Sequence, residues 1–153
     1  MINSEDIKFI PEALSNLKPG AKWFVKDTEI QWLDENVKRP TDDEIKAEIN
    51  RLKIVKEKEK QRQEAKAKKD KALQNNTYTL SDGSVYQVRP QDFSNFQAAI
   101  QLGTDTDWIL ADNTVRHTTI DELKEILKNG IKQAKAIYDE YIDELKNIEE
   151  DNG

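Results

Sequence analysis

The chain has 153 residues, of which 36% are hydrophobic and 35% charged, so it can hold one modest domain or two small ones. The net charge of −6 disfavours a general nucleic-acid binder, and the lack of cysteine excludes disulfides, iron–sulfur clusters and thiolate zinc sites. No stretch approaches the roughly 18 apolar residues that a membrane span requires.

The first predicted domain, residues 1–40, is a short helix followed by a hairpin. A proline stands in the first turn of this helix, and a Lys-Pro-Gly turn ends it. Two short apolar runs then flank a polar turn, which predicts two antiparallel strands. Trp23 and Trp32 are expected to meet across this hairpin. Forty residues cannot form a deep core, so the domain must pack against something else.

The second segment, residues 41–75, is predicted to be one long helix that begins with a capping box of Thr41 and Glu44. Its first half carries an apolar stripe at helical spacing, which predicts packing against a neighbour: Ile45, Ile49 and Leu52. Its second half, residues 56–71, holds eight positive and four negative side chains. Such a run favours helix without a core of its own, so we interpret it as a solvated spacer or the outer part of a weak coiled coil.

The third predicted domain, residues 76–153, has the order hairpin, helix, hairpin, helix. Asp82-Gly83 predicts a type I′ turn in the first hairpin, and Gly103 ends the first helix. Thr119 and Glu122 form a capping box before the final helix. This order hints at a duplicated hairpin-plus-helix plan. The predicted fold class is therefore α+β: two small hairpin-plus-helix modules linked by a long charged helix.

No residues form a recognisable catalytic set. His117 is the only histidine, and nothing near it in sequence resembles a nucleophile with a base and an orienting group. A weak calcium site can be imagined among four neighbouring oxygen donors, but they lack the spacing of a calcium-binding loop: Asp105, Asp107, Asp112 and Asn113. The sequence predicts no enzyme activity, no cofactor and no metal.

Four aromatic residues are the candidates for partner binding: Trp23, Trp32, Tyr138 and Tyr141. Aromatic side chains at such positions most simply belong to a core, but they become interface anchors where they are exposed. The sequence leaves open whether the long helix and the final helix pack together as an antiparallel pair.

Two passages resemble proteins of tailed bacteriophages. The first carries a Leu-Lys-Pro-Gly-Ala-Lys-Trp run and lies at residues 13–23, 30–33 and 40–41. The second resembles a domain of unknown function in phage and prophage proteins that are often labelled tail-fibre assembly proteins. It lies at residues 80–83, 95–100, 108–113, 118–119 and 122–123.

The resemblance implies an assembly chaperone that binds and covers the tip of a tail fibre in the cytoplasm of an infected or lysogenic bacterium. The alternative is a structural virion component, either a tail fibre or a baseplate adaptor, made trimeric by the long helix. A third reading is a host-directed regulator with a protein target. The expected partner is a fibre or another tail protein, with no nucleic acid and no membrane, and self-association stays open.

Overall fold

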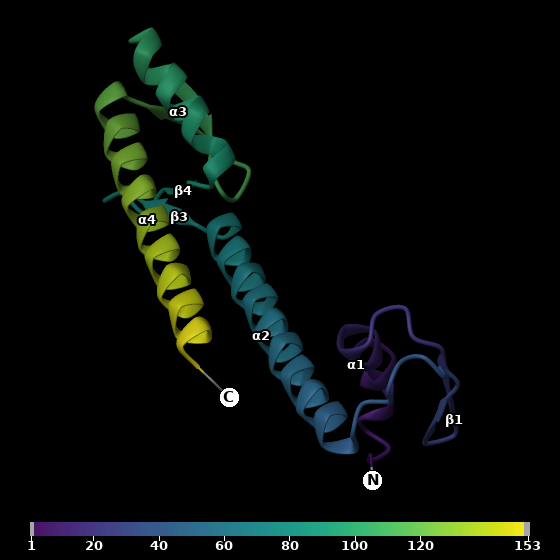
Figure 1. Ribbon diagram of the computed structural model, residues 1–153. Coiled ribbons are helices and arrows are strands. Elements are labelled where there is room, and N and C mark those ends of the chain that lie inside the picture. The colour runs from purple at the N-terminus through teal and green to yellow at the C-terminus, as the bar shows by residue number, and fades with distance from the viewer. Residues whose placement is uncertain (1, 152–153) are drawn as a thin grey trace. The chain divides into compact units, whose positions relative to one another are not determined.

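The computed structural model describes residues 2–151 and has the predicted α+β class (Figure 1). The chain forms two compact units, one up to Lys60 and the other from Gln61 to Asp151. The division falls inside the longest helix, α2 (Asp42–Gln74). The prediction from the sequence has three segments instead, 1–40, 41–75 and 76–153, because the long helix is expected to be a separate spacer between two domains.

The N-terminal unit is built from a short helical region, a hairpin and the first half of α2. Its elements are η1 (Ile7–Phe9), α1 (Ile10–Leu17), β1 (Trp23–Lys26) and β2 (Glu29–Trp32). The predicted placement of Trp23 across the hairpin from Trp32 is confirmed, because the two residues are opposite each other in the β1–β2 register. The predicted capping box also forms: the Thr41 side chain accepts from the Glu44 N–H, and the Glu44 side chain accepts from the Thr41 N–H.

The apolar stripe of α2 packs inside this unit, as predicted. Ile45, Ile49 and Leu52 are buried in one cluster with Ile10 and Leu14 of α1. The stripe is therefore occupied by contacts within the chain, and it is not available as the seam of a long trimeric coiled coil.

The C-terminal unit contains two hairpins that are each followed by a helix. Its elements are β3 (Thr77–Thr79), β4 (Val85–Gln87), α3 (Pro90–Leu102), β5 (Thr106–Ile109), β6 (Val115–Thr118) and α4 (Ile120–Glu150). Gly103 ends α3 in the left-handed conformation, and Thr119 and Glu122 form the capping box of α4, both as predicted. The core gathers side chains from both hairpins and both helices: Leu80, Tyr86, Val88, Phe96, Leu110, Leu123 and Ile126.

The two hairpins of this unit share one turn design. Gly83 and Asn113 have positive φ, and their N–H groups donate to the carbonyls of Leu80 and Leu110. The predicted type I′ turn is wrong, because it requires positive φ at two successive residues and Asp82 does not adopt it. The matching segments are residues 80–85 (LSDGSV) and 110–115 (LADNTV), so the hint of duplication extends to the turn sequence.

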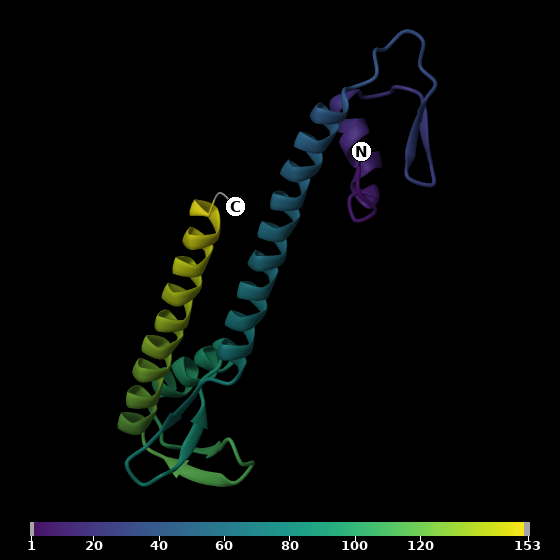
Figure 2. The same cartoon turned by 90° about the horizontal axis from the view of Figure 1, so that it is seen from below.

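The second half of α2 is not a solvated spacer. It packs against the C-terminal half of α4, and both views show the two helices side by side (Figures 1 and 2). Ala65 and Leu73 are buried, and Arg62 forms an ion pair with Glu149. The pairing is antiparallel, because Lys68, later in α2, reaches the earlier Glu140 and Glu144 of α4. The interpretation as a spacer failed because alanines and aliphatic lysine stems supply the packing surface where large apolar residues are absent.

A glycine in the middle of α4 permits a close approach of the first hairpin. A Cβ on Gly130 would lie 2.7 Å from the Cβ of Val88. The buried Asn76 side chain donates to the carbonyls of Val88 (2.9 Å) and Gly130 (3.3 Å), which ties the end of α2 to both elements. The glycine therefore has a packing role that offsets its low helix propensity.

Candidate protein-binding surfaces

The N-terminal hairpin has an inner face that packs on the core and an outer face that is exposed. Trp23 and Trp32 lie on the inner face and are half-buried against the cluster around α1. The Trp32 indole N–H donates to the Val37 carbonyl at 2.8 Å, so its polar atom is used within the chain. Two of the four predicted binding residues are therefore supports of the hairpin, with only part of their surface open to a partner.

The outer face of the same hairpin presents two large apolar side chains that the sequence analysis did not select. Phe24 is 46% exposed and Leu33 is 57% exposed. Phe24 is opposite Gln31, and the Leu33 N–H donates to the Lys22 carbonyl, so the two side chains are diagonal neighbours on one face. The alternation of side chains along a strand could have predicted the exposure of Phe24, because Phe24 stands between Trp23 and Val25, which both point inward.

The hairpin β5–β6 repeats this arrangement in the C-terminal unit. Its inner face carries Trp108, whose ring stacks on Phe96 with centroids 4.3 Å apart and planes 16° apart. Its outer face carries Ile109 and Val115, which are opposite each other and are both 65% exposed. The outer face therefore has an exposed apolar pair that contributes little to the core.

The related hairpin β3–β4 provides an internal comparison. Thr79 and Val85 are opposite each other there, at the positions that Ile109 and Val115 occupy in β5–β6. Val85 is half-buried, and its carbonyl accepts from the Ala111 N–H at 2.9 Å. The hairpin β3–β4 thus has a threonine and a half-buried valine at the positions where β5–β6 exposes two aliphatic side chains. The same hairpin plan is therefore built without a fully exposed aliphatic pair at these positions.

His117 lies beside this apolar pair, on the same outer face. Its Nδ1 is 3.0 Å from an Asp107 carboxylate oxygen, and its Nε2 is 3.8 Å from an Asp105 oxygen. The Ile120 N–H donates to the other Asp105 oxygen, so this carboxylate also serves the start of α4. Within residues 2–151, no group of three or more histidine or acidic side chains could hold a metal ion. The arrangement gives the face a polar, ionisable margin.

Arg116 fixes the two hairpins of the C-terminal unit to the start of α4. Its guanidinium donates to the carboxylates of Asp82 (3.0 Å) and Glu122 (2.8 Å) and to the Tyr86 hydroxyl (3.0 Å). The Tyr86 hydroxyl is also 2.7 Å from the buried Thr118 hydroxyl. This network has no signature in the sequence, because its members are up to 40 positions apart and only the Thr119–Glu122 cap has a local pattern.

The network shifts the pKa values of its charged members. The Arg116 hydrogen bond, followed by the Thr119 N–H, lowers the pKa of Glu122 to about 2. The Glu122 and Tyr86 hydrogen bonds raise the pKa of Arg116. The Ser84 backbone and side chain, with Arg116, lower the pKa of Asp82. The ionised forms are therefore favoured, and the charged contacts join both hairpins to the start of α4.

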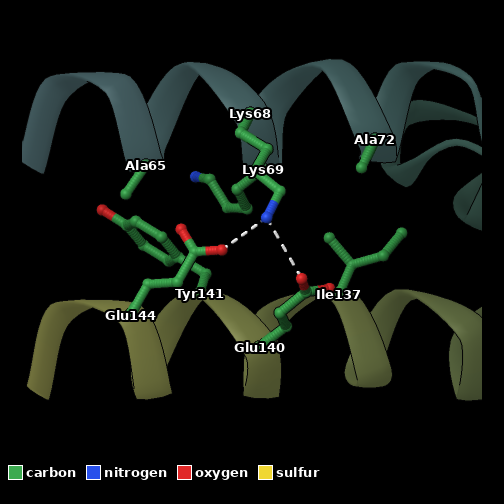
Figure 3. A pocket seen from close by; sticks show the side chains of 8 residues that line it. All are labelled: Ala65, Lys68, Lys69, Ala72, Ile137, Glu140, Tyr141 and Glu144. Atoms are coloured by element: carbon green, nitrogen blue, oxygen red, sulfur yellow. Dashed lines mark hydrogen bonds and ion pairs between the residues drawn. The ribbon is translucent and has the colours of Figure 1, made fainter. Parts of the chain in front are cut away.

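The other two predicted binding residues lie where α4 meets α2. The Lys69 ammonium is 5.6 Å from the Tyr138 ring centroid and 5.0 Å from that of Tyr141. Tyr141 is half-buried and lines a cavity of about 20 Å³, enough for one water molecule, whereas Tyr138 stays exposed. Lys68 bridges Glu140 and Glu144 across this cavity, and Figure 3 shows both ion pairs as dashed lines. The site is too small for a ligand larger than water.

The chain belongs to a family described as a domain of unknown function (DUF4376), whose model matches residues 56–152. The match includes the second half of α2, both hairpins of the C-terminal unit and α4. No curated protein and no solved structure matches the chain. Among the described residues, no helix is long and apolar enough to cross a membrane.

Proposed function

We propose that the protein is a non-enzymatic assembly chaperone that binds β-rich segments of a phage tail fibre. The observation that supports this best is the exposed Ile109–Val115 pair on β5–β6, at positions where the related hairpin β3–β4 has Thr79 and a covered Val85. The choice of a fibre as the partner rests on the phage resemblance of residues 80–123. Such a chaperone would act in the cytoplasm of the infected or lysogenic bacterium.

Open strand edges favour a β-rich partner. Each of the six strands among the described residues pairs with one other strand only. A two-stranded hairpin therefore offers backbone groups to an incoming strand, and its outer-face side chains can pack on alternate residues of that strand. Fibre tips are β-rich and slow to find their register, so their unpaired edges need temporary cover.

The N-terminal hairpin adds a second surface of the same kind on the same chain. Phe24 and Leu33 form its exposed outer-face pair. When two weak sites are linked, the second binding event is intramolecular, which can raise the overall affinity about 10²–10⁴-fold if both sites reach one partner. Two small surfaces can thus hold a fibre segment firmly and still release it stepwise.

The alternative role as a trimeric virion component has less support. It needs an apolar seam on the long helix, but Ile45, Ile49 and Leu52 are buried against α1 of the same chain. The remaining part of α2 pairs with α4 through Ala65 and through ion pairs.

The direct test is co-expression of the chain with a tail-fibre protein from the same phage or prophage, with soluble fibre trimer as the readout. We expect Ile109→Thr/Val115→Thr, which makes the outer face more polar than the Thr79–Val85 pair of β3–β4, to reduce the yield of trimer. Leu102→Gln is the matched control, because Leu102 is also highly exposed but lies at the end of α3. Equal yields with wild type and the hairpin variant would exclude this surface as the chaperone site.

A second experiment separates the chaperone from a virion component. Quantitative mass spectrometry would compare the protein in infected-cell lysate with the protein in purified particles. Abundance in lysate and absence from particles is the expected result. A fixed copy number per particle, in multiples of three or six, would instead identify a structural part of the tail.

A further inference from the structure

Helix α4 carries a second apolar stripe that stays largely exposed, with contact from α2 at Tyr138, whose ring lies 5.6 Å from the Lys69 ammonium. Ile131, Tyr138 and Ile142 are 43%, 43% and 45% exposed, and Leu145 beside them is half-buried. Spacings of seven and four residues place these four side chains, here called the outer stripe, on one face of the helix. The exposure is therefore continuous along three turns of α4.

The outer stripe is one half of a heptad pattern. Residues 131, 138 and 145 repeat every seven positions, and so do residues 134, 141 and 148, as in a coiled-coil seam. The second set meets the chain's own helices, because Ala134 is buried and Tyr141 faces α2. The first set has the apolar character of a helix–helix contact. Helix α2 reaches it at Tyr138 through the Lys69 ammonium, whereas the small residues Ala65 and Ala72 lie against the neighbouring face of α4.

The charges of α4 change sign along the helix. Residues 124–135 contain four lysines and one glutamate, whereas residues 139–150 contain six acidic residues and one lysine. A parallel copy of this helix would put like charges together, and an antiparallel copy would put opposite charges together. Part of the acidic charge is already matched by Arg62 and Lys68 of α2, so the polarity sets orientation more than affinity.

We propose that the outer stripe is the interface between two copies of this chain, with the two α4 helices antiparallel. A twofold axis near Tyr138 would place Ile131 of one copy opposite Leu145 of the other, because these residues lie seven positions on either side of Tyr138. An antiparallel second copy brings the apolar residues of the two stripes together and also places the basic half of one helix beside the acidic half of the other. An unrelated helix would have to match both features independently.

The dimer is expected to be weak. Four side chains per copy bury much less than the roughly 800 Å² per partner of a standard stable interface. Self-association should therefore depend on concentration, with a dissociation constant on the order of 10–100 μM.

Sedimentation equilibrium of the full chain over a concentration series is the first test. We expect a monomer–dimer equilibrium for wild type and a monomer for Ile131→Gln/Ile142→Gln, with far-UV circular dichroism unchanged. The control Ile54→Gln alters a similarly exposed residue of α2 in the other unit and should still dimerise. A wild-type monomer at concentrations up to about 1 mM would overturn the proposal.

The orientation can be tested by disulfide cross-linking, because the chain has no cysteine of its own. Tyr138→Cys should cross-link to itself under mild oxidation, since residues at a twofold axis come within the short Cα–Cα distance that a disulfide needs. Ile131→Cys and Leu145→Cys should each stay monomeric and cross-link only when mixed. Efficient self-linking of Ile131→Cys would show parallel helices, and no cross-link in the mixture or in Tyr138→Cys would remove the interface altogether.

Discussion

Replacing Glu122 by glutamine should destabilise the C-terminal unit in a pH-dependent way. The pKa of Glu122 falls from its ordinary 4.5 to about 2 in the folded chain. One pKa unit equals about 1.4 kcal/mol, so the full linkage is roughly 3 kcal/mol. The Arg116 and Glu122 side chains remain 25% and 28% exposed, and solvent screening reduces this value. We expect Glu122→Gln to lower the free energy of unfolding by roughly 1–2 kcal/mol at pH 7.

The sign of the pH dependence follows from the lowered pKa. The folded state favours ionised Glu122, so its stabilisation is complete above about pH 4.5 and is lost as the pH falls toward 2. Glutamine cannot titrate but can still take the capping position. The stability difference between wild type and Glu122→Gln should therefore shrink steadily over this acid range.

Urea unfolding at a series of pH values measures this difference without adding salt. Trp108 fluorescence reports on the C-terminal unit alone when Trp23 and Trp32 are replaced by phenylalanine. Asp121→Asn is the matched control, because Asp121 lies in the same first turn of α4 but is exposed. A difference between wild type and Glu122→Gln that stays constant from pH 7 to pH 2, or one that Asp121→Asn reproduces, would refute the role of the Arg116–Glu122 contact.

Three further substitutions test the packing by the same unfolding assay. Gly130→Ala should cost about 1 kcal/mol or more, since overpacking outweighs the gain in helix propensity, and a stabilised variant would contradict the close approach. Tyr86→Phe removes a hydroxyl that bonds Thr118 and the nearby arginine, so it should cost about 1–3 kcal/mol, and a neutral result would show that the network is not cooperative. Ala65→Gln should destabilise by about 1–3 kcal/mol whereas the exposed Ala67→Gln should not, and equal tolerance at both positions would restore the spacer interpretation.

Local signals in the sequence were sufficient to predict the elements of the fold. The capping boxes at Thr41 and Thr119, the glycine at 103 and the alternation around Trp23 and Trp32 each depend on residues within a few positions of one another. Such signals define where helices and strands begin and end. They also gave the apolar stripe of α2 that packs into the N-terminal core.

The features that depend on distant contacts could not be predicted in the same way. The second half of α2 has no apolar periodicity, so its packing on α4 through Ala65 and ion pairs has no sequence signature. Arg116 is one arginine among several charged residues until the fold brings Asp82 and Tyr86 to it. The choice of binding candidates was limited in the same way. The tryptophans predicted to bind a partner lie on the inner face of the N-terminal hairpin, whereas the exposed Phe24 and Leu33 lie on its outer face.

The repeated hairpin-plus-helix plan separates the part of the sequence that maintains the fold from the part that can vary. Packing and hydrogen bonds constrain the inward positions, the turn residues and the Arg116 network. The outer positions at 109 and 115 are opposite each other in the hairpin and are both 65% exposed, so the core constrains them little. A duplicated scaffold of this kind lets one copy conserve structure while the other changes its partner. Because both side chains are 65% exposed, substitutions at these two positions should cost little folding stability, which leaves the outer face free to change.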